Sequence, residues 1–179
     1  MNKVFRIAGL IAATVLLAGC GLFGDKEEEL KPMKLVDIDE VVTVKRAWSA
    51  KLGGDSEFLR LALRPTGDGS RIYAASQDGT VSAFDPESGQ VIWRTDLEIE
   101  LTAGPGAGEG NVVVTSKDGM AILLDATDGS EKWRVSIEGE SLARPLIKED
   151  RVVVQTIDNR LQGLSLFDGR SLWSCLLYT

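Results

Sequence analysis

A repeat with a period of 40 residues constrains the fold of this 179-residue chain more than any other feature. Its members are Trp93, Trp133 and Trp173, the glycines four positions before them (Gly89, Gly129 and Gly169), and the turn pairs Asp78-Gly79, Asp118-Gly119 and Asp158-Asn159. Because several residue types recur in one register, the chain must contain repeated structural units. Units of this length are typical of solenoids and propellers, in which neighbours bury each other's apolar faces.

Each unit consists of short apolar runs separated by turn residues. Residues 111–116 and 151–156 are rich in valine and have the length of a strand. They lead into Asp118-Gly119 and Asp158-Asn159, which tolerate positive φ in tight hairpins. Residues 102–108 are mostly small, which suits a crowded inner strand, and no helical periodicity follows residue 40. Four strands in about 40 residues predict an all-β fold, a β-propeller of four-stranded antiparallel blades.

The segment from Ala83 to Trp93 carries the pattern Ala-x-Asp-x-x-x-Gly-x-x-x-Trp. This pattern resembles the tryptophan-docking motif of quinoprotein-type propellers, in which the outer-strand tryptophan packs against a neighbouring blade. The resemblance implies structural docking roles for Trp93, Trp133, Trp173, Gly89, Gly129 and Gly169. The other units depart from the pattern at Leu123 and Ser165, and we expect a reorganised turn at residues 167–169 and weaker docking there. Ligand stacking is the alternative role for the tryptophans, but a spacing equal to the repeat favours packing.

A fourth tryptophan, Trp48, lies 45 residues before Trp93. Residues 41–50 resemble the tryptophan-bearing outer strand of the repeat, without the three strands that should precede it. We therefore predict that residues 41–50 form a closing strand for a blade whose other strands are missing. The five additional residues fit a longer connection around residues 64–69.

The N-terminus has the three parts of a secretory leader. Lys3 and Arg6 are basic, residues 7–17 form an apolar run, and residues 17–20 read Leu-Ala-Gly-Cys. This last tetrad resembles the bacterial lipobox, which implies cleavage after residue 19 and attachment of diacylglycerol and an N-acyl chain to Cys20. An ordinary signal peptide with an incidental cysteine is the alternative. Gly21 in place of aspartate implies outer-membrane delivery under the usual rules of lipoprotein sorting.

These features divide the chain into four segments. We expect a lipoprotein signal peptide at 1–19, the lipidated cysteine and a flexible tether at 20–38, and a partial propeller of about three blades at 39–175. The charged run at 25–29 and Pro32 favour a solvated tether. The repeat pattern is lost after Trp173, so residues 176–179 are predicted to be a non-native tail on the front part of a longer protein. We assign no role to Cys175.

Composition excludes several classes of function. The chain has no histidine, which removes Ser-His-Asp and Cys-His catalysis and every histidine-bearing metal site. Its net charge is −7, and loss of Lys3 and Arg6 with the leader makes it −9, a poor match for nucleic acid. Two cysteines are too few for a disulfide scaffold. We expect no catalytic residue, no metal site and no cofactor.

The combination of a lipobox, an acidic tether and quinoprotein-like repeats resembles the BamB family of outer-membrane assembly lipoproteins. That resemblance implies an eight-bladed, non-catalytic scaffold, lipid-anchored on the periplasmic face of the outer membrane. Its implied partners are the periplasmic domains of BamA, other subunits of the assembly complex and nascent outer-membrane proteins. The enzyme alternative is a PQQ-dependent quinoprotein dehydrogenase, which would need a quinone pocket, calcium ligands and a catalytic aspartate. A sugar- or peptidoglycan-binding propeller would need aromatic platforms.

Overall fold

The computed structural model describes residues 32–35, 41–53 and 63–178. The chain divides into two units, residues 1–43 and 44–179. The expected signal peptide at 1–19 and Cys20 lie outside the described residues, as does most of the expected tether, and residues 32–35 have no regular secondary structure. Within the described ranges there is no helix long and apolar enough to cross a membrane.

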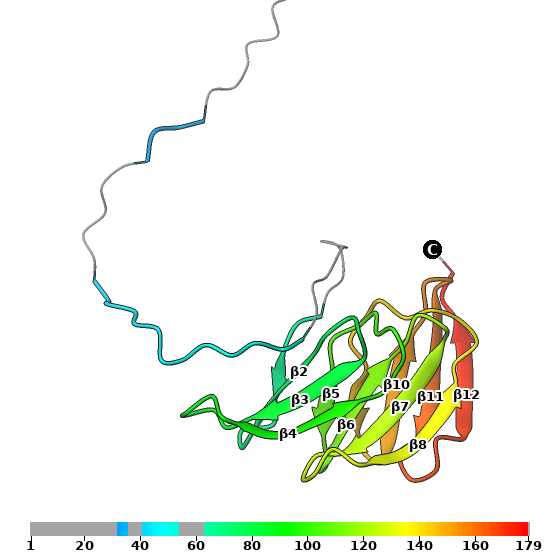
Figure 1. Ribbon diagram of the computed structural model, residues 1–179. Coiled ribbons are helices and arrows are strands. Elements are labelled where there is room, and N and C mark those ends of the chain that lie inside the picture. Colours follow the sequence, from blue (N-terminus) through cyan, green and yellow to red (C-terminus); the bar gives the residue numbers. More distant parts are fainter. Residues whose placement is uncertain (1–31, 36–40, 54–62, 179) are drawn as a thin grey trace, which may run out of the picture. The chain divides into compact units, whose positions relative to one another are not determined.

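Twelve strands in the second unit form three antiparallel four-stranded sheets (Figure 1). The first sheet contains β1 (Thr66–Gly67), β2 (Ile72–Ala75), β3 (Thr80–Phe84) and β4 (Val91–Asp96). The second contains β5 (Gly106–Gly108), β6 (Asn111–Thr115), β7 (Met120–Asp125) and β8 (Glu131–Ser136). The third contains β9 (Leu146–Lys148), β10 (Arg151–Gln155), β11 (Arg160–Ser165) and β12 (Ser171–Leu176). One sheet per repeat confirms the predicted propeller blades.

The hairpins between the second and third strands of each blade turn where the sequence predicts. Gly79, Gly119 and Asn159 have φ of 100°, 72° and 62°, a region that favours glycine and tolerates asparagine. Each donates its backbone N–H to a carbonyl three residues earlier, at 3.1–3.2 Å. The repeated turn residues therefore close the hairpins, as expected.

Two apolar layers hold the blades together. β6 contributes to both: Val112 and Val114 lie in the layer shared with the first sheet, and Val113 lies in the layer shared with the third. Successive side chains of a strand point to opposite faces, so a middle blade is buried on both sides. This explains why β6 and β7 are apolar runs, without the alternation of a half-exposed strand.

The inner strands need small residues because they approach the next blade closely. β5 has the sequence Gly-Ala-Gly and neighbours β9. A Cβ on Gly106 would overlap the carbonyl group of Pro145, which directly precedes β9. The prediction of a crowded inner strand in this glycine-rich segment is confirmed.

Residues 41–50 do not form the predicted closing strand. The segment has no strand structure and is mostly exposed, although all of it is described. A strand is defined by its ladder to a neighbour, and the described residues contain no sheet to which this segment could pair. The innermost strand β1 occupies Thr66–Gly67, within the stretch that was expected to be a long connection.

The turn of the third blade is not reorganised as expected. The Gly169 N–H donates to the Ser165 carbonyl at 2.9 Å, as the Gly89 N–H does to Asp85 and the Gly129 N–H does to Asp125. Backbone geometry therefore persists when serine replaces aspartate. β12 also runs one residue past the expected boundary at Cys175, and the Leu177 N–H donates to the Asn159 carbonyl at 2.8 Å. The backbone register thus continues where the side-chain pattern is lost.

Candidate docking sites

Trp93 joins the first blade to the second. It lies on β4 opposite Ala83 of β3 and is only 7% exposed. Its indole N–H donates to the carbonyl of Ala126, in the β7–β8 turn of the second blade, at 3.0 Å. The hydroxyl of Thr95 donates to the carbonyl of Gly129 in the same turn, at 2.7 Å. Two adjacent residues of β4 thus fix the neighbouring turn through its backbone.

Gly129 is required by this contact. Its φ is 75°, and a Cβ at this position would overlap the Trp93 ring. The glycine therefore provides both a left-handed turn and a flat surface for the indole. Gly89 has the same relation to Trp48, with φ 71° and no room for a Cβ beneath the ring.

Trp133 repeats the arrangement one blade later. Its indole N–H donates to the carbonyl of Leu166 at 2.9 Å, and its ring lies on Gly169, which has φ 73°. The ring is half-buried. Trp173 lies over Gly163, its partner across the β11–β12 ladder, and is 40% exposed. Its indole N–H has no hydrogen-bond acceptor in the part of the chain that the structure describes.

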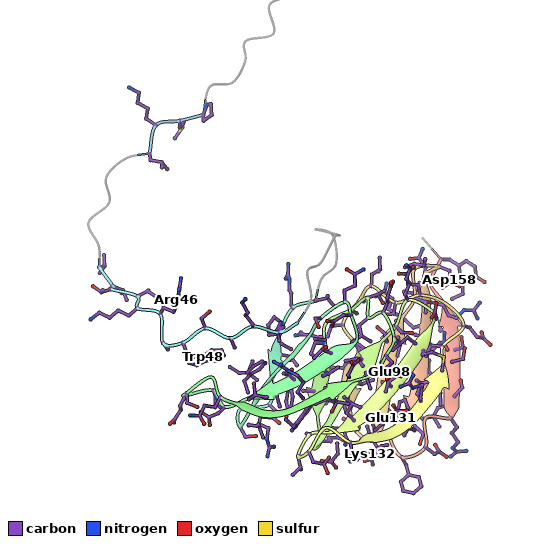
Figure 2. The ribbon with its side chains drawn as sticks, in the orientation of Figure 1. Arg46, Trp48, Glu98, Glu131, Lys132 and Asp158 are labelled. Atoms are coloured by element: carbon purple, nitrogen blue, oxygen red, sulfur yellow. The ribbon has the colours of Figure 1, made fainter. Side chains whose placement is uncertain are left out.

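Trp48 makes the same contact with the first blade, although its segment is not a strand. Its indole N–H donates to the carbonyl of Pro86 at 2.9 Å, and its ring stacks on Phe84 with centroids 6.3 Å apart (Figure 2). Arg94 also donates to the carbonyl of Lys51 at 3.2 Å. Residues 48–51 are therefore attached to the blade by side chains and not by a backbone ladder.

The acceptors of these indoles are residues that sequence reasoning did not identify. Pro86, Ala126 and Leu166 each lie three positions before the docking glycine. They share no side-chain chemistry because each accepts through its backbone carbonyl. Their common offset from the glycine is a signal that the repeat contains, but residue type gives no hint of it.

The aspartates of the repeat stabilise turns. Asp85 accepts hydrogen bonds from the hydroxyl and the backbone N–H of Ser88, and these hydrogen bonds lower the pKa of its carboxyl. Asp125 binds the Lys132 ammonium at 2.8 Å and the Thr127 N–H at 2.7 Å, which lowers its pKa to about 2. Both are charged hydrogen-bond acceptors at neutral pH. Among the described residues, no three acidic, cysteine or histidine side chains lie together as metal ligands would.

Comparison with known proteins identifies the repeat. Residues 77–179 match the model of a family described as outer membrane protein assembly factor BamB. The chain is 39% identical over 110 residues to a protein of that name from Pseudomonas aeruginosa, covering 62% of this chain and 28% of the relative. It is 43% identical over 98 residues to another from Alkalilimnicola ehrlichii, covering 55% and 24%. The chain thus spans about a quarter of the length of these relatives.

Solved structures give the same picture. The crystal structure of BamB from Moraxella catarrhalis matches with a TM-score of 0.61 at 30% identity, over 66% of this chain and 37% of that one. A quinohemoprotein alcohol dehydrogenase from Comamonas testosteroni matches with a TM-score of 0.52 at 19% identity, over 64% and 21%, which shows a shared fold alone. Because the family model matches more than half of its residues, this chain belongs to the BamB family of outer membrane protein assembly factors.

Proposed function

We propose that the protein is a non-catalytic scaffold of the machinery that assembles β-barrel proteins into the outer membrane. The observation that carries the proposal is the family match over residues 77–179, which contains the second and third blades entire. The described polar groups act as turn formers and inter-blade acceptors, and this is the chemistry of a rigid framework. We infer BamA, other subunits of the complex and nascent outer-membrane proteins as partners.

The lipobox supports a location on the periplasmic face of the outer membrane. We propose that the leader is cleaved after residue 19 and that Cys20 carries the lipid anchor. Several acyl chains on one residue exceed the single chain that gives only marginal membrane binding. The tether at 20–38 would then separate the anchor from the propeller.

We also propose that further blades complete the propeller in the whole protein. Trp173 has the cross-strand position of Trp93 and Trp133, yet it is far more exposed than Trp93. Leu142 is 48% exposed, whereas Thr102, its equivalent one repeat earlier, is buried and donates to the Ser141 carbonyl of the next blade at 2.7 Å. A following blade would cover both Trp173 and Leu142.

Affinity capture of the whole lipoprotein from outer membranes tests the function. We expect BamA to be recovered with it, and failure to recover BamA after mild crosslinking would overturn the scaffold role. A dye-linked oxidation assay with added quinone and calcium provides the second arm. Turnover of alcohols in that assay would replace the proposal with a dehydrogenase.

A further inference from the structure

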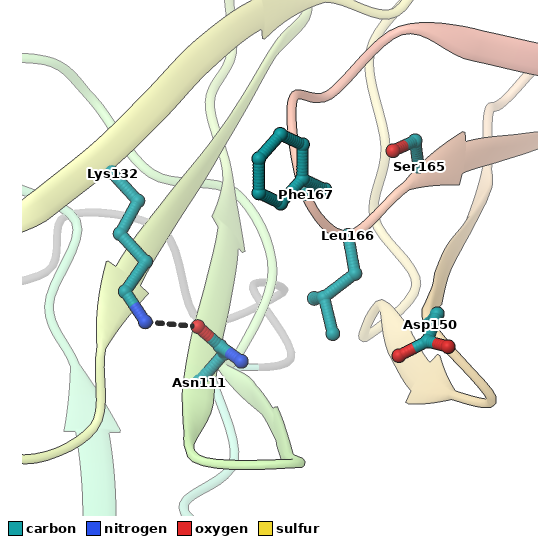
Figure 3. Close-up of a pocket in the computed structure, with 6 residues that line it drawn as sticks. All are labelled: Asn111, Lys132, Asp150, Ser165, Leu166 and Phe167. Atoms are coloured by element: carbon teal, nitrogen blue, oxygen red, sulfur yellow. Dashed lines mark hydrogen bonds between the residues drawn. The ribbon is translucent and has the colours of Figure 1, made fainter.

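A cleft opens between the second and third blades, beside the docking contact of Trp133. It has a volume of about 740 Å³ and is lined by Asn111, Lys132, Asp150, Ser165, Leu166 and Phe167 (Figure 3). The two blades contribute different walls, because Asn111 and Lys132 belong to the second blade and the other four residues to the third.

The backbone around the cleft is tied across both blades. The Leu166 N–H donates to the Asp150 carbonyl at 2.9 Å, within the third blade. The carboxylate of Glu109, in the second blade, accepts the N–H groups of Glu149 and Asp150 at 2.6 and 3.1 Å. A site with fixed walls loses less conformational freedom on binding than a mobile loop does.

The charges in the cleft leave one carboxylate unpaired. Lys132 is engaged within its own blade, by Asp125 at 2.8 Å and by the Asn111 side-chain oxygen at 2.7 Å. Asp150 uses its backbone N–H and carbonyl in the contacts above, but its carboxylate has no hydrogen bond or ion pair within the described residues. Since Lys132 and Asp125 cancel, the cleft offers the negative charge of Asp150.

An aromatic ring stands beside that charge. Phe167 is 93% exposed at the tip of the β11–β12 turn. The equivalent positions of the first two blades are Glu87 and Thr127, so the turn does not need an apolar residue there. A single exposed apolar side chain is ordinary. An exposed ring that lines a cleft with an unpaired carboxylate, however, is the combination that recognises a planar cation.

We propose that this cleft binds the guanidinium group of an arginine from a basic segment of a partner protein. Asp150 accepts its paired N–H groups, and Phe167 stacks on its plane. Lysine fits less well, because its ammonium has neither a planar face nor a fork of parallel donors. The chain's net charge of −7 adds long-range attraction for a basic segment.

Peptide titration followed by NMR tests the proposal. The probes are three Gly/Ser peptides that carry one central arginine, lysine or citrulline, added to the full chain at low salt. We expect the arginine peptide to shift the Phe167 ring and Asp150 amide signals. The lysine peptide should bind several-fold more weakly, and the citrulline peptide, which lacks the charge, should not bind measurably.

Matched variants localise the binding. Asp150→Asn and Phe167→Thr should each weaken binding of the arginine peptide by about fivefold or more. Asparagine tolerates the φ of 59° at position 150, and threonine already occupies the equivalent position 127. Glu149→Gln removes the same charge one residue away, and Tyr178→Thr removes another exposed ring. Both controls should change the affinity less than twofold.

Equal binding of the three peptides, or unchanged affinity in folded Asp150→Asn and Phe167→Thr, would overturn the proposal. Signal shifts centred on the acidic connection at Glu98 and Glu100 would also overturn it. The inference goes beyond the scaffold role and does not rest on it. Failure to recover BamA would leave the peptide result intact, and failure of peptide binding would leave the scaffold role intact.

Discussion

Glycine at the docking turns satisfies two separate requirements, and the chain offers a way to measure each. Gly129 and Gly110 have nearly the same φ, 75° and 71°. A Cβ on Gly129 would overlap Trp93, whereas a Cβ on Gly110 would meet no atom within 4 Å. The first position combines backbone strain with a steric clash, and the second has the strain alone.

Replacement of these two glycines by alanine should therefore have unequal effects. Gly110→Ala should lower the free energy of unfolding by about 1–2 kcal/mol, the usual cost of a left-handed non-glycine residue. Gly129→Ala should cost roughly 1–3 kcal/mol more, because Trp93 must move off the turn. Urea unfolding monitored by tryptophan fluorescence measures both. Equal losses would show that the indole does not rest on Gly129.

Asp68 stabilises the first hairpin as a charged acceptor. It accepts hydrogen bonds from the Tyr73 hydroxyl at 2.7 Å and from the N–H groups of Ser70 and Arg71 at 2.8 and 2.9 Å. Partial burial raises its pKa, but these hydrogen bonds outweigh burial and lower the pKa to about 2. Burial first, and then the bond to Asp68, raises the pKa of Tyr73 to about 12.

The Asp68 contribution to stability should disappear in acid. Because its folded pKa lies below the ordinary value of 3.8, its contribution is complete above about pH 4–5 and is lost as the pH falls toward 2. The gap in urea midpoint between the natural chain and Asp68→Asn should thus narrow between pH 6 and pH 2.5. Asp118→Asn, which removes a carboxylate that accepts no hydrogen bond within the described residues, should show no such narrowing.

At the scale of elements, the outer strand of one blade and the turn of the next form a recurring joint. An indole N–H reaches a backbone carbonyl in all three complete joints, at 2.9–3.0 Å. The joint does not require a strand, since Trp48 makes it from an irregular segment. Side-chain docking and backbone pairing are therefore independent ways of attaching a segment to a blade.

Removal of each tryptophan should weaken the protein in proportion to its burial. Trp93→Ala should cost about 3–5 kcal/mol of unfolding free energy, and Trp133→Ala several kcal/mol, because both lose packing and leave a cavity. Trp173→Ala should cost about 1 kcal/mol, since the ring is 40% exposed. Differential scanning calorimetry gives the order. An unchanged melting temperature for Trp133→Ala would contradict its packing role.

At the scale of the whole molecule, an acidic propeller follows a leader whose only charged residues are basic. The described blades carry the family match, whereas the leader and Cys20 lie outside the described residues. Their role rests on the lipobox alone. Membrane attachment and propeller structure are therefore separable properties.

Loss of the predicted lipid anchor should change location without unfolding the blades. Cys20→Ser should abolish incorporation of radiolabelled palmitate and move the protein out of the membrane fraction, because the acyl chains provide the binding energy. The variant's circular dichroism should match that of the natural protein. Cys175→Ser is the matched control, and it should stay lipidated. Palmitate in the Cys20→Ser protein would contradict the lipobox assignment.

The sequence determined the period, the blades and the tryptophan-bearing strands of this protein. These features are local: glycine at Gly79 and Gly119 closes hairpins, and valine runs such as residues 112–114 favour strands, wherever the rest of the chain lies. The docking tryptophans were found in the same way, because their spacing equals the repeat.

Only the tertiary structure decided which groups meet. It showed that residues 41–50 lack a ladder, because a strand depends on a neighbour and not on its own residues. It selected carbonyls such as that of Ala126 as indole acceptors, since a backbone group has no signature in residue type. It also brought Lys132, Asp150 and Phe167 to one cleft from two blades. Contacts between units depend on how the blades pack, and the repeat pattern within a unit does not contain that information.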